Sequence, residues 1–325
     1  MGTAIDLGLI YGIMAMGVFL TYRVLNLPDL TVDSSFTTGA GTAAILIVNG
    51  VHPVLGTAAG FVAGALAGGA TALLHTKFKI DPLLASILVM IALWSVNLRI
   101  MGKPNVSLLN LPTLFSPLKP SEIGQTDHTG TWVSILILFT AIFVLKLGVD
   151  WFMRTNFGLA VQATGDNQAM ASSFGINNNF TKTVTLMLAN GLAGLSGAVY
   201  AQYQGFADIS MGVGMILIGL ASVIVGNAII RGKHIFFATI GVLVGSVIYR
   251  LILFFALTAS FLSANDMKLI SAITVIIALV LSENKQVQRF FRHLSRRVVE
   301  LAKNPRLLVE AISAKKRKNS QKKGK

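Results

Sequence analysis

Long apolar runs alternate with short polar segments along most of this chain, and the pattern predicts membrane-spanning helices. A helix needs roughly 20 mainly apolar residues to cross the hydrocarbon core of a bilayer. Nine runs approach or reach that length: Ile5–Tyr22, Ser35–Val48, Val54–Leu74, Leu83–Met101, Thr131–Leu147, Thr183–Tyr203, Met211–Ile230, Ile235–Leu257 and Leu269–Leu281. We therefore predict an all-α, polytopic transmembrane helical bundle with about nine spans. The first run lacks a basic segment before it and continues to full span length, so we expect an anchor rather than a cleavable signal.

Composition supports this interpretation and excludes a soluble domain. Of the 325 residues, 54% are hydrophobic and 12% are charged, whereas soluble domains carry about 25% charged residues. Mean hydropathy is +0.70. The chain has no cysteine, which excludes disulfides, thiolate metal sites and thiol nucleophiles.

The net charge of +14 is concentrated at the carboxyl end. Residues 285–325 contain 14 Lys and Arg against 2 Glu. We interpret 1–284 as the membrane domain and 285–325 as a basic cytoplasmic tail, partly disordered and held near an anionic membrane surface. Because the basicity lies in this tail, we expect no nucleic-acid partner.

The distribution of Lys and Arg among the loops predicts the orientation. Short cytoplasmic loops carry an excess of these residues. If the amino terminus is outside, the tail and most basic loop residues are inside: Arg23, Lys77, Lys79, Lys146, Arg154, Lys182, Arg231 and Lys233. Only Arg99, Lys103, Lys119 and Lys268 are then outside. We predict the amino terminus out and the carboxyl terminus in.

Polar residues inside the apolar runs are candidates for the solute pathway. Asp29–Gly41 is rich in Asp, Ser and Thr, which lipid would not tolerate, so we expect a helix start buried in protein, with Asp33 as its N-cap. Arg250 lies within the eighth run, where it either reaches the outer interface, pairs with Asp208 or Asp266, or contacts an anionic group of the solute. The candidate pathway residues are Asp33, Ser35, Asn97, Asn190, Tyr200, Asn227 and Arg250. A packing role as interhelical hydrogen-bonding groups is the alternative for Asn97, Asn190, Tyr200 and Asn227.

One cytoplasmic connection, residues 151–182, is too long and too structured to be a simple turn. Its sequence predicts two short helices separated at Gly165, with Asp166 or Asn167 capping the second and Gly175 in the left-handed conformation that ends it. Met170 and Phe174 are four residues apart and would share one face, which could insert into a groove on a partner.

Three stretches carry a family resemblance. They are Gly8-Leu-Ile-Tyr-Gly, Arg23-Val-Leu-Asn26 with Asp29-Leu-Thr-Val-Asp33, and Ala163-Thr-Gly-Asp-Asn167 followed by Gly175-Ile-Asn177. Together they resemble the ABC-transporter permease of the branched-chain amino-acid type. Asp29–Phe36 and Leu98–Asn105 resemble a subgroup of tryptophan and tyrosine uptake permeases.

The resemblance implies a permease subunit of an ATP-driven importer in the bacterial cytoplasmic membrane, for an amino acid that is possibly aromatic. Its implied partners are a cytoplasmic ABC ATPase, an extracytoplasmic solute-binding protein, and a second copy or homologue of the chain. ATP and Mg²⁺ would be bound by the ATPase, since this chain has no G-x-x-x-x-G-K-[ST] loop. Hence we expect no cofactor and no enzymatic activity here. The residues expected to couple to the ATPase are Gly158, Ala163, Gly165, Asp166, Asn167, Met170, Phe174 and Gly175.

Two other functional classes compete with this one. An ion-coupled secondary transporter would need intramembrane titratable or sodium-coordinating groups, and these are scarce in the sequence. An integral membrane enzyme would need clustered His, acidic or Ser residues at a membrane face, and no such cluster is evident.

Overall fold

The structure is a computed structural model that describes residues 2–116, 128–230, 234–258, 272–273 and 276. Its helices are α1 (Gly2–Val18) continued by the π-helical η1 (Phe19–Val24), α2 (Thr31–Val48), α3 (Pro53–Thr76), α4 (Pro82–Met101), α5 (His128–Arg154), α6 (Asn156–Asp166), α7 (Gln168–Ser173), α8 (Asn178–Gln204), α9 (Met215–Ile229) and α10 (Ile235–Thr258). Strands β1 (Asn105–Ser107) and β2 (Phe206–Asp208) form an antiparallel pair. The predicted helical bundle is confirmed.

The number of long apolar helices differs from the nine predicted spans. Within the described residues six helices are long and apolar enough to cross a membrane: Gly2–Val24, Pro53–Thr76, Pro82–Met101, Ile135–Arg154, Asn178–Gln204 and Ile235–Phe255. α9 is shorter than these helices. The polar residues in the first half of α2 lower the mean hydropathy of that helix. The ninth run and the boundary at 284 lie almost wholly outside the described residues.

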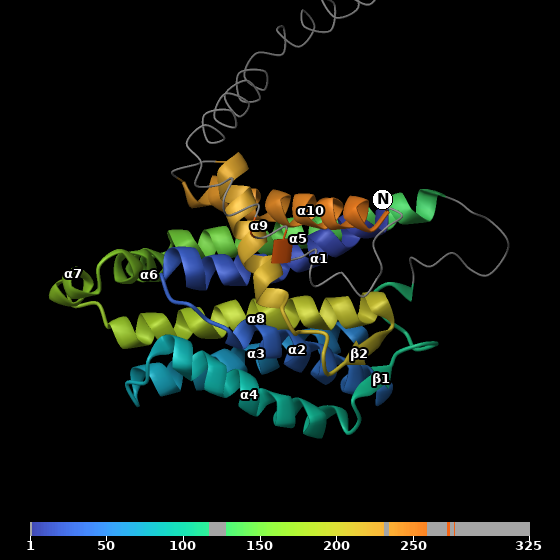
Figure 1. The fold of residues 1–325 in the computed structure, drawn as a ribbon, viewed down its shortest axis with the longest axis horizontal. Helices are drawn as coiled ribbons and strands as arrows, with labels where there is room; N and C mark the ends of the chain where they lie inside the picture. Colours follow the sequence, from blue (N-terminus) through green and yellow to red (C-terminus); the bar gives the residue numbers. More distant parts are fainter. Residues whose placement is uncertain (1, 117–127, 231–233, 259–271, 274–275, 277–325) are drawn as a thin grey trace, which may run out of the picture.

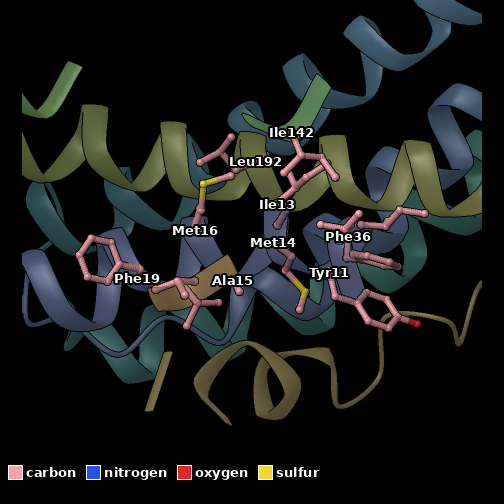
Figure 2. Close-up of a cluster of buried hydrophobic side chains, with 14 of the residues drawn as sticks. Tyr11, Ile13, Met14, Ala15, Met16, Phe19, Phe36, Ile142 and Leu192 are labelled. Carbon is pink, nitrogen blue, oxygen red and sulfur yellow. The ribbon is translucent and has the colours of Figure 1, made fainter. Parts of the chain in front are cut away.

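The helices divide into interior and peripheral ones. Most residues of the apolar stretches of α1 with η1 and of α8 are buried inside the structure, 83% and 72% respectively. In α4 and in α5 only 28% are buried. α1 packs against α10, α8, α9 and α5, while α2 and α3 pack against the other side of α8. In Figure 1, α1, α5 and α10 lie on one side of α8, and α2, α3 and α4 lie on the other. α9 crosses from the first set towards the second. A large hydrophobic cluster surrounds α1 and η1: Tyr11 and Met14 of α1 and Phe19 of η1 pack with Phe36 of α2 and Leu192 of α8 (Figure 2).

Small residues allow these helices to approach closely. A Cβ atom on Gly64 or Gly68 of α3 would overlap the backbone of α8, and one on Gly245 of α10 would overlap the backbone of α9. In a membrane, where apolar side chains gain little by leaving lipid, such close backbone packing is a main source of helix association.

The two ends of the bundle are built differently. α6 and α7 project from one end, and the β1–β2 pair lies at the other (Figure 1). Asn105 is opposite Asp208 in the pair, and the two side chains are joined by a 3.2 Å hydrogen bond. The pair joins the connection after α4 to the connection after α8.

Candidate functional site

The connection between α5 and α8 forms two short capped helices. The Thr155 hydroxyl accepts a 3.2 Å hydrogen bond from the Gly158 amide at the start of α6. The prediction that the two helices separate at Gly165 is wrong, because α6 continues through it to Asp166. Gly165 lies against the backbone carbonyl of Val24, which a Cβ atom would overlap. The glycine thus allows α6 to pack against the end of η1 rather than breaking the helix.

The break falls at Asn167, whose backbone is extended. Its side-chain oxygen accepts from the Met170 amide at 3.0 Å, so Asn167 rather than Asp166 caps α7. The Asn167 amide in turn donates to the Ala163 carbonyl. Gly175 follows α7 with φ of +80°, the left-handed conformation expected from the sequence.

α7 presents apolar side chains to its surroundings. Met170 is 58% exposed and Phe174 is 74% exposed, whereas Ala171 between them is buried. Exposed large apolar side chains on a protruding helix are typical of a docking surface.

Inside the bundle, α2 begins at buried Asp29 beside Asn190 of α8, and α9 begins at half-buried Asp33 of α2. Asp29 accepts from the Thr31 amide at the start of α2 and from the Asn190 side chain of α8, at 2.9 Å and 2.6 Å. Asp33 accepts from the amides of Gly214 and Ile216 at the start of α9, at 2.8 Å and 2.6 Å. The prediction that Asp33 caps its own helix is therefore wrong: Asp33 lies in the first turn of α2 and caps α9. Both carboxylates face the positive ends of helix dipoles.

Other predicted pathway residues join helices. Asn190 accepts a 2.7 Å hydrogen bond from Ser35 of α2, and Asn97 of α4 donates to the Ser34 carbonyl at 3.4 Å. Asn227 is half-buried in the last turn of α9. These contacts fit the alternative of interhelical hydrogen bonding for Asn97 and Asn190.

Tyr200 belongs to an aromatic cluster near Arg250. Its ring centroid lies 5.4 Å from that of Tyr11 and 5.6 Å from that of Phe36. The Arg250 guanidinium carbon lies 5.4 Å from the Tyr11 centroid, within the range of a cation–π contact. The expected ion pair with Asp208 is not formed, since that carboxylate binds Asn105 and Ser210 in the β-strand end. Asp266, the other expected partner, lies outside the described residues.

Asp6 is a residue of this region that we did not single out from the sequence. It is 3% exposed and accepts a 3.2 Å hydrogen bond from the Tyr203 hydroxyl. Its second oxygen, Oδ1, is buried with no hydrogen-bond partner among the described residues. A lone acidic residue in the first apolar run was the available signal, because ionisable groups are rare at membrane depth.

The described residues contain no group of three His, Cys, Asp or Glu side chains that could hold a metal ion.

Long apolar helices around a polar interior, with helices starting inside the bundle, define a multi-pass integral membrane permease. The chain belongs to the ABC-transporter permease family described as branched-chain amino acid transport system, permease component, whose model matches residues 2–280. Within ABC transporters the translocation subunits of this family are not enzymes.

Individual relatives agree with this family. A protein of Clostridioides difficile (strain R20291) named tyrosine transport system permease protein is 40% identical over 86% of this chain and 90% of that protein. A probable branched-chain amino acid transport permease protein, LivH, of Methanocaldococcus jannaschii is 27% identical over 74% of this chain and 77% of that protein. A solved structure, PsaBC from Streptococcus pneumoniae in complex with Fab, has a similar fold. Its TM-score is 0.50, with 14% identity over 89% of this chain and 93% of that one.

Proposed function

We propose that this chain is the translocating subunit of an ATP-driven importer whose solute is an amino acid with an aromatic side chain. The observation that carries the proposal is the placement of Asp6 and Arg250 around one cluster of tyrosines. Asp6 accepts from the Tyr203 hydroxyl and Arg250 lies against the Tyr11 ring, yet the two side chains form no ion pair with each other within the described part of the chain. The relative named for tyrosine transport supports the same class of solute.

The chemistry of a zwitterionic amino acid matches these groups. Its ammonium would bind the Asp6 carboxylate, whose Oδ1 has no partner among the described residues, and its carboxylate would bind the Arg250 guanidinium. An aromatic side chain would pack on Tyr11 and Tyr200, for which offset or edge contacts are favourable. We call the site formed by Asp6, Tyr11, Tyr200 and Arg250 the solute station. Separation of α1, α8 and α10 would open it, because those helices carry its side chains.

The two ends of the bundle offer different surfaces for the proposed partners. A cytoplasmic ATPase would receive Met170 of α7 and the adjoining Phe174 in a groove and would bind ATP and Mg²⁺ itself. A solute-binding protein would dock at the end that carries β1 and β2. A second permease, identical or homologous, would complete the transporter. This arrangement requires the amino terminus outside and the carboxyl terminus inside.

Uptake by the reconstituted complex of permease, ATPase and binding protein tests the solute station. Losing a hydrogen bond to a charged group costs about 1.5–3 kcal/mol, or about tenfold or more in binding. Asp6→Asn and Arg250→Gln should each lower tyrosine uptake by that factor, while Arg99→Gln, an exposed arginine of α4, should not. Unchanged uptake in both variants, with the complex intact, would contradict the station.

Co-purification of the ATPase tests the docking surface. Met170→Asp and Phe174→Asp should release it, whereas Leu109→Asp, equally exposed but at the opposite end, should not. Solute movement by the purified chain alone under an ion gradient would instead support the secondary-transporter alternative.

A further inference from the structure

A pocket of about 470 Å³ lies between α7 and the adjoining ends of α3 and α8. His75 and Lys79 line it from the α3 side, Gln168 and Ser172 from α7, and Asn177 and Lys182 from the start of α8. Small-molecule sites have volumes of about 300–1,000 Å³, so the pocket has room for a small metabolite. None of the candidate coupling or pathway residues lines it.

Both hydrogen-bond partners of the Lys182 ammonium are neutral. Its side chain is 7% exposed, and its ammonium donates to Nε2 of His75 at 3.3 Å and to Oε1 of Gln168 at 3.0 Å. Nδ1 of His75 lies 2.9 Å from the Ile80 carbonyl, which can only accept. Nδ1 therefore carries the proton, and Nε2 is left to accept from Lys182.

The pocket holds more positive charge and more donors than its own residues neutralise. An ammonium has three donors, and the contacts above use two of those on Lys182. Lys79 adds a second cation, and no acidic residue is among the described residues that line the pocket. Asp81, the acid nearest to Lys79 along the chain, already accepts from the amides of Leu83 and Leu84.

A nearly buried charge without a counter-charge is costly, and an oxyanion is the group that supplies both the charge and the acceptors. We propose that this pocket binds a small oxyanion of the phosphate type, presented by a phosphorylated metabolite or by a phospholipid headgroup. The anion would be held by Lys182 and Lys79, with the side-chain amide of Asn177 as a further donor.

Such an anion would connect three elements: the loop after α3, the start of α8, and α7. It would hold α7 against the bundle and thereby slow any motion of α7 relative to α8. That regulatory consequence rests on the proposed function, but the binding itself does not.

Titration of the purified chain in detergent with inorganic phosphate, at constant ionic strength in chloride, tests the site. Thermal unfolding and ³¹P NMR line broadening report saturable binding independently of transport. Lys79→Met should weaken phosphate binding about tenfold, the effect of one lost charged contact. Lys77→Met, which removes an exposed lysine two residues away that does not line the pocket, should leave it unchanged. Lys182→Met should abolish binding.

The outcomes separate the two sources of the oxyanion. Saturable phosphate binding that is weakened in Lys79→Met and unchanged in Lys77→Met supports a free anion. An anionic phospholipid retained by the wild-type chain and Lys77→Met in native mass spectrometry, but not by Lys79→Met, supports a headgroup. If neither ligand distinguishes the two variants, the proposal is wrong, whether or not tyrosine uptake and ATPase binding behave as proposed above.

Discussion

Asp33 is a residue of α2 whose carboxylate serves another helix. Its oxygens accept from Gly214 and Ile216, so it neutralises the amino end of α9 where that helix starts inside the bundle. Asp33→Asn would replace one acceptor oxygen with an amide donor that faces a backbone N–H. Because hydrogen bonds to charged groups contribute about 1.5–3 kcal/mol, we expect a loss of stability of that order in thermal unfolding.

Hydrogen exchange localises this effect. The amides of residues 212–218 should exchange faster in Asp33→Asn. Asp81→Asn provides the comparison, because Asp81 caps its own helix, α4. In that variant the amides of residues 82–86 should exchange faster, and those of α9 should stay protected. Equal protection of α9 in the wild type and Asp33→Asn would show that the cap contributes nothing.

Asp208 forms pH-dependent hydrogen bonds at the end of the bundle that carries β1 and β2. Partial burial alone would raise its pKa, but hydrogen bonds from the Ser210 side chain and amide and from Asn105 outweigh burial and lower the pKa below its usual value. The ionised form is the one that these donors stabilise. Its contribution to folding is therefore present above the pKa of the unfolded chain, near 3.9, and is lost as pH falls through the lower folded pKa.

Thermal unfolding of the wild type and Asp208→Asn should accordingly differ at pH 7 and remain different at pH 5. The difference should shrink below about pH 4, where the carboxylate begins to take up a proton. Asp166→Asn, which removes an exposed carboxylate at the end of α6, is the control for the loss of one surface charge. A difference that grows on acidification would have the wrong sign for this contact.

At the scale of elements, the packing of α6 on η1 depends on Gly165. A methyl group there would overlap the Val24 carbonyl, and forcing extra atoms into a packed contact costs about 1–3 kcal/mol. Gly165→Ala should therefore lower the unfolding temperature and also impair transport, because α6 carries α7. Gly148→Ala in α5 meets nothing within 4 Å. In that helix it should be neutral or stabilising by about 0.5–1 kcal/mol. Equal unfolding temperatures for the two variants would contradict the role of Gly165.

The elements also show what the sequence could and could not predict. Apolar runs located the long helices. Because capping is a local property, the sequence also narrowed the cap of α7 to Asp166 or Asn167 and predicted the left-handed Gly175. Gly165 was misread because a glycine used for close approach looks like one used for a break. The role of Asp33 was missed because its partners Gly214 and Ile216 are distant in sequence, and no local pattern reports such a contact.

For the whole molecule, the family was predictable while the interior chemistry was only partly so. Arg250 and Tyr200 were found as polar residues in apolar runs, but Asp6 was overlooked and the expected Arg250–Asp208 pair was wrong. Which charges meet depends on how α1, α8 and α10 pack, and hydropathy does not encode that packing. The solute station and the coupling surface remain proposals for the same reason.

Orientation in the membrane is the property on which all proposed partners depend. Arg23, Lys77 and Lys79 lie at or near the ends of helices on the α6–α7 side, and the excess of basic residues predicts that this end is cytoplasmic. The chain has no cysteine, so a single introduced cysteine gives an unambiguous label. We expect a membrane-impermeant maleimide to label Ser107→Cys of β1 in intact cells and Ser173→Cys of α7 only after permeabilisation. Both positions are exposed, which means that a failure to react reports the membrane side rather than burial. Labelling of α7 from outside would place the ATPase-docking surface on the wrong side of the membrane and would rule out the importer as proposed.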